Sequence, residues 1–360
     1  MRLHLKLPLV FAVFLGLFSP AFAANDQARE AYYEGIKARD ANDYQRSHSL
    51  LCVAAKAEYP DAVMECGMTY LLGAGVARNV QNGILLLARA AELKVGAAAF
   101  RLSLLYLKGE VVQRDLAKAK TYLLQGANLG SGEAEYALAN AYMRGMTVDG
   151  VVVFAKDVVQ AAIWMEKAAS YSMQSSFDYG IVLYQGIGRP SDKMEGLKWI
   201  EMSIGMGGMK AADVLTKIYR TDAEVKALYD EQGLQMVQQH EAGEGGRIYD
   251  VVGPGFGRAP PAGMVMVDPT FYFRLGLRAA YGLGVSGGPV AAVKYWQHDI
   301  DSNVGFSGSM FLLGMAYYTG TGVVEDKVKG IALLQRLNMG SHEGAAAFLR
   351  SIKAPLKPPK

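Results

Sequence analysis

The two cysteines of the chain, Cys52 and Cys66, are the first residues whose type and spacing allow chemistry, because two thiols can form a disulfide. Each lies seven residues from Tyr59, between segments with apolar residues at helical spacing. Two antiparallel helices place positions equidistant from their turn side by side, so this pair could be bonded. The equivalent positions further along hold Leu124 and Leu138, which favours two small buried apolar side chains instead. The sequence leaves both interpretations open.

Residues for metal binding or catalysis do not occur at the spacings that these functions need. The histidines after the N-terminal segment are scattered, and none begins an H-E-x-x-H motif: His48, His240, His298 and His342. The stretch GPGFGR lacks the lysine and hydroxyl residue of a phosphate-binding loop. We therefore expect no catalytic residue, no metal and no cofactor, and we interpret the chain as not an enzyme.

Charge and composition give no case for a nucleic-acid partner. The chain has 37 lysines and arginines against 34 aspartates and glutamates, whereas nucleic-acid binding needs a clustered basic surface. Its 51% hydrophobic and 20% charged residues are typical of a packed globular protein. Three tryptophans share one position in the predicted helices, so we expect them to pack between helices rather than stack on sugars: Trp164, Trp199 and Trp296.

The N-terminus has the pattern of a cleaved secretory signal. Arg2 and Lys6 precede the apolar run from Leu7 to Phe18, and Ala21-Phe22-Ala23 is an A-x-A cleavage site. No cysteine follows that site, so a lipid anchor is not expected. We expect residues 1–23 to be removed and the mature chain, which has no other long apolar run, to be periplasmic or secreted without a membrane span.

A recurring pattern of small residues and glycines predicts the elements. Six segments align on a small residue, and the first three are 36 residues apart: Gly67, Ser103, Ala139, Gly180, Gly276 and Gly314. A glycine-containing loop and a second apolar segment follow each of them, so each unit is predicted to be helix, loop, helix. Neither helix buries its apolar face alone, and the units must therefore stack. The predicted fold is an all-α superhelical solenoid.

The repeat resembles the Sel1-like repeat family, which is related to the tetratricopeptide repeat. The shared pattern is A-x-x-x-L-G-x-x-Y-x-x-G-x-G-V followed by D-x-x-K-A, and MFLLGMAYYTGTGVVEDKVKGIALL matches it well. The resemblance covers residues 62–216 and 271–350, and the opening segment is similar to a tetratricopeptide-type hairpin. It implies a scaffold or regulator in envelope signalling, exopolysaccharide production or host interaction.

The organisation that we predict has two arrays. Residues 24–242 form the first array with a closing helix, for which Thr221 and Glu224 suggest a capping box. Residues 243–270 are rich in glycine and proline and form a linker or insertion. Residues 271–352 form a second pair of repeats, and residues 353–360 an extended tail.

Residues two before and five after each small anchor lie on one helical face, and their chemistry varies where the packing residues do not. We take this face as the candidate partner surface, with an ordinary solvated face as the alternative. The candidates are Glu65, Arg101, Lys108, Arg144, Asp178, Gln185 and Arg274.

The predicted function is a non-enzymatic protein-protein interaction scaffold or regulator of the bacterial cell envelope, which binds a protein partner in the concave groove of the superhelix. A peptidoglycan- or polysaccharide-binding module is the alternative.

Overall fold

The computed structural model describes residues 20–245, 247–248, 266–302, 306–339 and 342–356. Most of these residues are helical, which confirms the predicted all-α repeat fold. The chain divides into two compact units, residues 1–134 and residues 135–360, called unit 1 and unit 2. Most of the predicted signal segment lies outside the described residues, and its end forms the start of the first helix.

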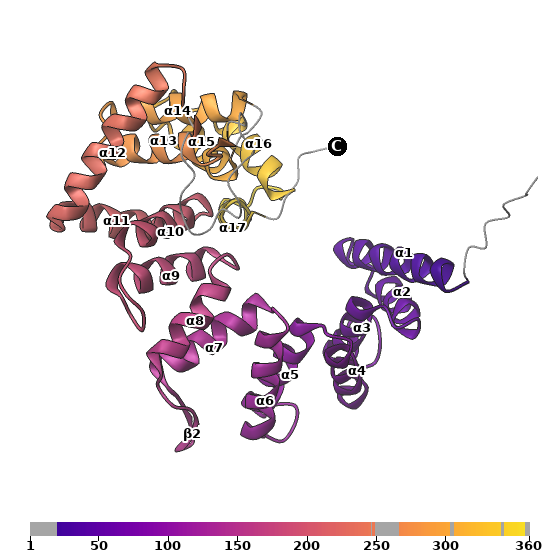
Figure 1. Ribbon diagram of the computed structural model, residues 1–360. Coiled ribbons are helices and arrows are strands. Elements are labelled where there is room, and N and C mark those ends of the chain that lie inside the picture. The colour runs from indigo at the N-terminus through magenta and orange to yellow at the C-terminus, as the bar shows by residue number, and fades with distance from the viewer. Residues whose placement is uncertain (1–19, 246, 249–265, 303–305, 340–341, 357–360) are drawn as a thin grey trace, which may run out of the picture. The chain divides into compact units, whose positions relative to one another are not determined.

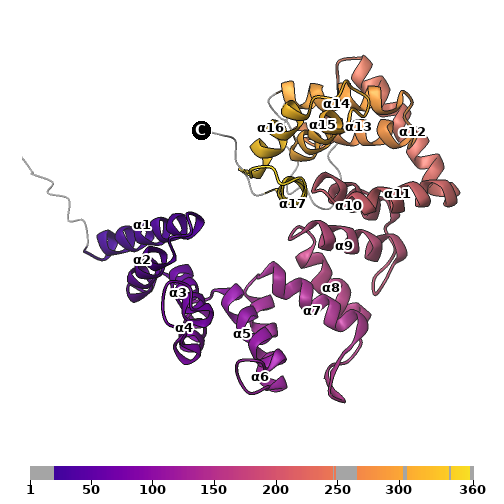
Figure 2. The same ribbon diagram turned by 180° about the vertical axis from the view of Figure 1, so that it is seen from behind.

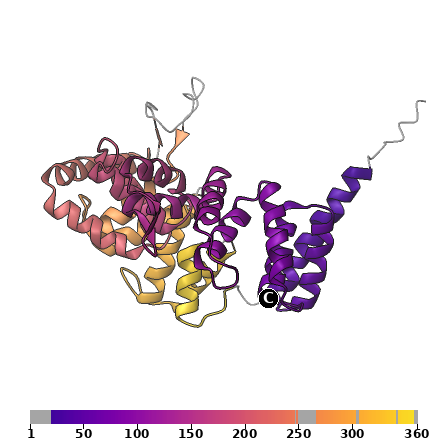
Figure 3. The same cartoon turned by 90° about the horizontal axis from the view of Figure 1, so that it is seen from below.

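Unit 1 consists of three helical hairpins (Figure 1). The indigo and violet helices at its N-terminal end lie side by side in Figure 3. Their bounds are α1 (Pro20–Asp40), α2 (Tyr44–Lys56), α3 (Pro60–Leu72), α4 (Val80–Glu92), α5 (Gly96–Lys108) and α6 (Leu116–Asn128).

Unit 2 contains the remaining helices and two short hairpins of strands. Figure 2 shows α12 to α16 gathered into one body of this unit. The elements are α7 (Gly132–Arg144, which begins in unit 1), β1 (Met146–Val148), β2 (Val151–Phe154), α8 (Val158–Ala168), α9 (Met173–Gln185), α10 (Lys193–Gly205), α11 (Met209–Thr221), α12 (Ala223–Glu241), β3 (Arg247–Ile248), β4 (Met266–Val267), α13 (Phe271–Tyr281), α14 (Gly288–Asp301), α15 (Ser307–Thr319), α16 (Lys327–Asn338) and α17 (Glu343–Ser351).

The small anchor residues hold the two helices of each repeat close together. All six are buried. A Cβ on Gly67 would lie 3.1 Å from the carbonyl oxygen of Gly83 on the paired helix α4, and one on Gly180 would lie 2.7 Å from that of Gly196 on α10. At Gly67 and Gly180 the anchor is therefore small because two backbones meet there, whereas a Cβ on Gly276 would meet the Trp296 ring.

The loop glycines are required by conformation and by contact. Gly73 ends α3 in the left-handed region, and Gly75 has a φ of 75°. A Cβ on Gly75 would overlap the carbonyl of Tyr44 at the start of α2, so the loop rests on the preceding repeat. The same overlap recurs at Gly188, Gly284 and Gly322.

Two strand hairpins interrupt the helices. In the first, β1 pairs antiparallel with β2, and the turn residues Asp149 and Gly150 both have positive φ. Asp-Gly with two positive φ values is a preferred two-residue hairpin turn. In the second, β3 pairs with β4 and joins the two ends of the predicted linker, whose residues 249–265 lie outside the described part of the chain.

The start of α12 differs from the predicted capping box. Asp222 is the N-cap, and its carboxylate accepts hydrogen bonds from the backbone N–H groups of Glu224 and Val225. Thr221 instead ends α11 and donates its hydroxyl to the carbonyl of Lys217. The prediction was wrong because aspartate, one residue later, is the stronger cap and is itself followed by a helix former.

A buried ion cluster joins helices from before and after the linker. Glu201 on α10 accepts from Arg274 Nε on α13 at 2.7 Å and from the Tyr229 hydroxyl on α12 at 3.0 Å. Arg278 is fully buried beside them, 3.5 Å from Glu201 and over the Tyr229 ring. Burial alone would raise the pKa of Glu201, but the two arginines outweigh it and lower that pKa.

The last helix folds back on the turn between α10 and α11. The N–H of Gly344 donates to Met206 O at 3.0 Å, and His342 Nε2 lies 2.9 Å from Gly205 O. The Glu343 carboxylate also accepts from the N–H of Met173 at 3.2 Å. Unit 2 is therefore closed by contacts between residues far apart in sequence.

The start of the predicted tail returns along α16. Gln335 Nε2 donates to Pro355 O, and Asn338 Nδ2 donates to Leu356 O. Residues 357–360 lie outside the described part. None of the described helices combines the length and the apolar character that crossing a membrane requires. The domain boundaries and the tail stay predictions.

Candidate functional site

Two adjoining hollows lie on one face of unit 1. The first has a volume of about 310 Å³ and lies between α2 and α3, with Leu51 and Met64 in its lining. The second has a volume of about 240 Å³ and lies between α3 and α5, with Leu71 and Leu105 in its lining. Met68, Leu72 and Arg101 line both hollows. We call the two together the paired groove.

Leu72 is the most unusual residue of the paired groove. It is the last residue of α3 and its side chain is 69% exposed, although most of its neighbours in the groove are apolar. Its position follows from the repeat, because residues five after the small anchor face away from the paired helix. An exposed leucine between two apolar hollows is a contact point that the fold of unit 1 leaves uncovered.

Charged side chains surround the apolar surface. Arg78, Arg101 and Lys108 line the second hollow with a single acid, Glu110. Arg101 approaches Glu133 at 3.5 Å with both side chains partly exposed, which is a weak pairing.

The first hollow is closer to neutral. Glu65 is paired there with Arg39, whose Nη1 lies 2.9 Å from its carboxylate. The excess positive charge therefore lies at the second hollow.

Of the predicted partner residues, Glu65, Arg101 and Lys108 line the paired groove. The others belong to unit 2, where Arg144 and Gln185 are exposed at the ends of α7 and α9.

Asp178 accepts from the Tyr136 hydroxyl at 2.6 Å, and burial together with this carboxylate raises the pKa of Tyr136 to about 12. Arg274 is held by Glu201 in the ion cluster and is only 17% exposed. Their role in partner binding stays a prediction.

Sequence reasoning missed several groove residues. Met68 and Arg78 were passed over because they lie outside the two positions considered in each repeat. Helical spacing could have identified Met68, because it is four residues before Leu72 and so lies on the same face of α3.

The three tryptophans, which we expected to pack between helices rather than stack on sugars, have neighbours in unit 2. Trp164 and Trp296 are 8% and 5% exposed, and Trp199 packs edge-on against Tyr179. Trp296 also donates its indole N–H to Phe273 O at 3.3 Å. The Trp164 and Trp296 rings are therefore buried in the packing of unit 2, and Trp199 packs there in part.

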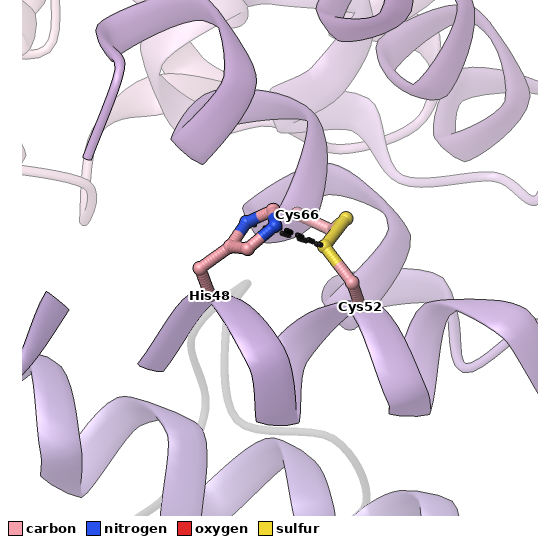
Figure 4. Close-up of side chains that lie close together, drawn as sticks. All are labelled: His48, Cys52 and Cys66. Atoms are coloured by element: carbon pink, nitrogen blue, oxygen red, sulfur yellow. Dashed lines mark hydrogen bonds between the residues drawn. A yellow bond between two sulfur atoms is a disulfide. The ribbon is translucent and has the colours of Figure 1, made fainter. Parts of the chain in front are cut away.

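The two cysteines are joined in a disulfide between α2 and α3, with their Cα atoms 5.1 Å apart (Figure 4). His48, one turn before Cys52 on α2, lies beside them, with Nδ1 3.5 Å and Nε2 3.9 Å from Cys52 Sγ. Burial lowers the pKa of His48. Sequence reasoning missed His48, although a separation of four residues places it on the same helical face as Cys52.

One nucleophile pattern escaped the sequence interpretation. Residues 284–288 read G-V-S-G-G, which has the letters of the G-x-S-x-G nucleophile elbow. The structure places Ser286 exposed in the loop between α13 and α14. An elbow requires a strand leading into a helix, so the match does not make Ser286 a nucleophile.

The comparisons with known proteins agree with the repeat pattern. The Sel1 repeat model matches residues 60–95, 96–131, 132–170, 174–207, 269–297 and 307–341. Comparison with curated proteins finds no match.

Solved structures with a similar arrangement include a protective antigen of uropathogenic Escherichia coli strains displaying an SLR fold, with 19% identity and a TM-score of 0.46, over 92% of this chain and 73% of that one. A Sel1 repeat protein from Oxalobacter formigenes has 19% identity and a TM-score of 0.41, over 56% of this chain and 80% of its own. An immunity protein from Pseudomonas aeruginosa has 16% identity and a TM-score of 0.35, over 54% and 72%.

The six matched segments cover more than half of the chain, and they coincide with the helical hairpins described above. The chain belongs to the Sel1 repeat family.

Proposed function

We propose that the chain is a non-enzymatic protein-binding scaffold of the bacterial cell envelope, and that the paired groove holds a segment of a partner protein. Sel1 repeats generally mediate protein-protein interaction. The observation that carries the proposal for this chain is the exposed Leu72 between two apolar hollows.

The chemistry of the groove indicates the kind of segment that fits. Burying the exposed part of Leu72 would contribute about 1 to 2 kcal/mol. The second hollow offers Arg78, Arg101 and Lys108 against Glu110, an excess of positive charge. The partner segment therefore carries an apolar anchor followed by aspartate or glutamate, which satisfies both the hollow and its rim.

The cellular location belongs to the same proposal. The basic and apolar N-terminal pattern supports export, and so does a disulfide, which persists in oxidising compartments. Fractionation of cells that express the tagged chain tests this part. Recovery of the chain only from the cytoplasm, with residues 1–23 still attached, would refute it.

The groove is tested by in-cell crosslinking of the tagged chain, identification of the captured protein, and titration of its crosslinked segment against purified variants. Leu72→Asp should weaken binding at least about tenfold, since it places a charge in the apolar contact. Arg101→Glu with Lys108→Glu should weaken it further and reduce its dependence on salt.

Leu85→Asp is the matched control, because Leu85 is 58% exposed on α4 and does not line either hollow. It should bind like the native chain. A partner that binds Leu72→Asp as tightly as the native chain, or that crosslinks only outside the groove, contradicts the proposal. Co-sedimentation with purified peptidoglycan in place of protein capture would favour the glycan-binding alternative.

A further inference from the structure

Three metal-ligating side chains meet between α2 and α3 (Figure 4). His48, Cys52 and Cys66 each offer one ligand atom, and these atoms lie within 4.8 Å of one another. Cys66 is buried at 3% exposure, whereas His48 and Cys52 are half-buried. The cluster therefore has a closed protein side and one side that a small ion can reach.

Thr69 determines which nitrogen of His48 is available. Its hydroxyl donates to the carbonyl of Cys66 at 2.7 Å, and its oxygen also lies 2.7 Å from His48 Nδ1. Because the single hydroxyl proton is used on the carbonyl, the oxygen must accept from Nδ1–H. Nε2 then keeps its lone pair, 3.9 Å from Cys52 Sγ. Metal-binding histidines commonly donate their other ring N–H to such a partner.

We propose that the reduced form of this cluster is a binding site for one thiophilic d¹⁰ metal ion, Zn²⁺ or Cu⁺, with Cys52 Sγ, Cys66 Sγ and His48 Nε2 as ligands and Thr69 orienting the imidazole. Ligands at about 2.3 Å for sulfur and about 2.0 Å for nitrogen lie roughly 3.5 to 3.8 Å apart around a tetrahedral ion. The Nε2 to Cys52 Sγ separation is already close to that value.

Metal and disulfide exclude each other at this site. A dithiol reductant gives two electrons and two protons to the Cys52–Cys66 bond, becomes a disulfide itself, and leaves two thiols. Each thiol loses its proton to solvent when the ion binds, because the thiolate is the ligand. The exposed side leaves a fourth position for water on Zn²⁺, whereas Cu⁺ is satisfied by the three protein ligands. The site therefore binds metal only where its surroundings keep Cys52 and Cys66 reduced.

The test uses the full chain, reduced with a phosphine under argon and freed of reductant. Co²⁺ is titrated as an optical probe, followed by displacement with Zn²⁺ and, in a separate arm, with Cu⁺. One equivalent should produce thiolate-to-cobalt charge-transfer absorption, and the oxidised chain should produce none. Displacement by only one of the two ions identifies which of them the site prefers.

Variants separate this site from adventitious binding. Thr69→Val should weaken Co²⁺ binding by about 10- to 100-fold, as expected for loss of an orienting partner. His48→Gln should weaken it more, and His298→Gln, on an exposed histidine of α14, should leave it unchanged. A folded, reduced chain that lacks the thiolate band, or that binds equally well with His48→Gln, overturns the proposal.

Reduction could also unfold α2 and α3, since the disulfide closes a loop whose constraint is worth about 3 kcal/mol. Circular dichroism distinguishes this case. One equivalent of metal should then restore the lost helicity in the native chain and not in His48→Gln. Failure to restore it would equally overturn the proposal.

Discussion

At the scale of single residues, two glycines with positive φ differ in the space available for a Cβ atom. Gly75 and Gly130 have nearly the same φ, 75° and 77°. A Cβ would meet the backbone of α2 at Gly75, whereas at Gly130 it would point into open space. Comparing alanine substitutions at these two positions therefore separates the free-energy cost of the backbone conformation from that of the contact between neighbouring repeats.

Gly75→Ala is expected to lower the free energy of unfolding more than Gly130→Ala. Both variants pay about 1 to 2 kcal/mol for alanine in the left-handed region. Only Gly75→Ala must also move the loop away from Tyr44 O, which adds about 1 to 3 kcal/mol. Urea unfolding followed by circular dichroism measures both variants. Equal losses would show that the contact between repeats has no energetic weight.

The residues that the sequence could predict recur from repeat to repeat, whereas those that it could not predict depend on partners on other elements. The small anchors and loop glycines act within one repeat, and their recurrence predicted both positions. The site of His48, Cys52 and Cys66 needs two helices and Thr69 as well, and the absence of zinc-finger spacing led us to expect no metal site. The Arg274–Glu201 pair spans 73 residues, and no local pattern marks it.

At the scale of elements, helix starts are set by caps that also connect helices. Asp222 caps α12 and accepts from the Tyr184 hydroxyl at 2.8 Å and from Lys193 Nζ at 3.0 Å. Asp326 caps α16 by accepting from the N–H of Lys329. The hydrogen bond from Tyr184, then that from Lys193, lowers the pKa of Asp222 to about 2.

Asp222→Ala should therefore destabilise the chain more than Asp326→Ala. Loss of a cap costs about 1 kcal/mol in each case, and Asp222→Ala also removes charged hydrogen bonds worth about 1.5 to 3 kcal/mol. Because the folded-state pKa is lowered, this contribution is present above pH of about 4 and disappears as the pH falls towards 2. Denaturant titrations at neutral pH compare the two variants, and a smaller loss for Asp222→Ala would contradict the expected order.

The sequence predicted helical elements more reliably than their interruptions. Helical spacing and the loop glycines located the repeat hairpins, whereas the strand hairpin with its Asp149-Gly150 turn was not predicted, although Asp-Gly is a hairpin signal. The missed cap at Asp222 has a similar cause, because Thr221 and Glu224 also fit the letters of a helix start. Only the backbone positions distinguish two adjacent candidates for a cap.

At the scale of unit 2, the return of α17 depends on a neutral histidine. His342 Nδ1 accepts from the N–H of Ala345, and Nε2 lies 2.9 Å from Gly205 O, to which it must donate. Burial lowers the pKa of His342, with Glu343 and Gly205 O opposing that effect and the Phe311 ring stacked on the imidazole. A protonated imidazole has no lone pair for the bond from Ala345.

The chain should lose stability as the pH falls below about 6.5, the ordinary pKa of histidine in the unfolded chain, because the unfolded state then takes up a proton that folded His342 does not. His342→Asn keeps a cap acceptor and removes this titration. Its free energy of unfolding should therefore change less between pH 7.5 and 5.5 than that of the native chain. Parallel pH profiles would exclude His342 as the cause.

The contacts of α17 with the α10–α11 turn also bear on how such a chain can evolve. An open repeat array lengthens readily by gene duplication, because each new unit touches only its neighbours. Here the duplication of a 36-residue repeat between α13 and α16 would move α17 away from the α10–α11 turn. The hydrogen bond from Gly344 to Met206 O would then be lost. Descendants of this sequence should vary in the number of repeats in unit 1 while keeping that number constant in unit 2.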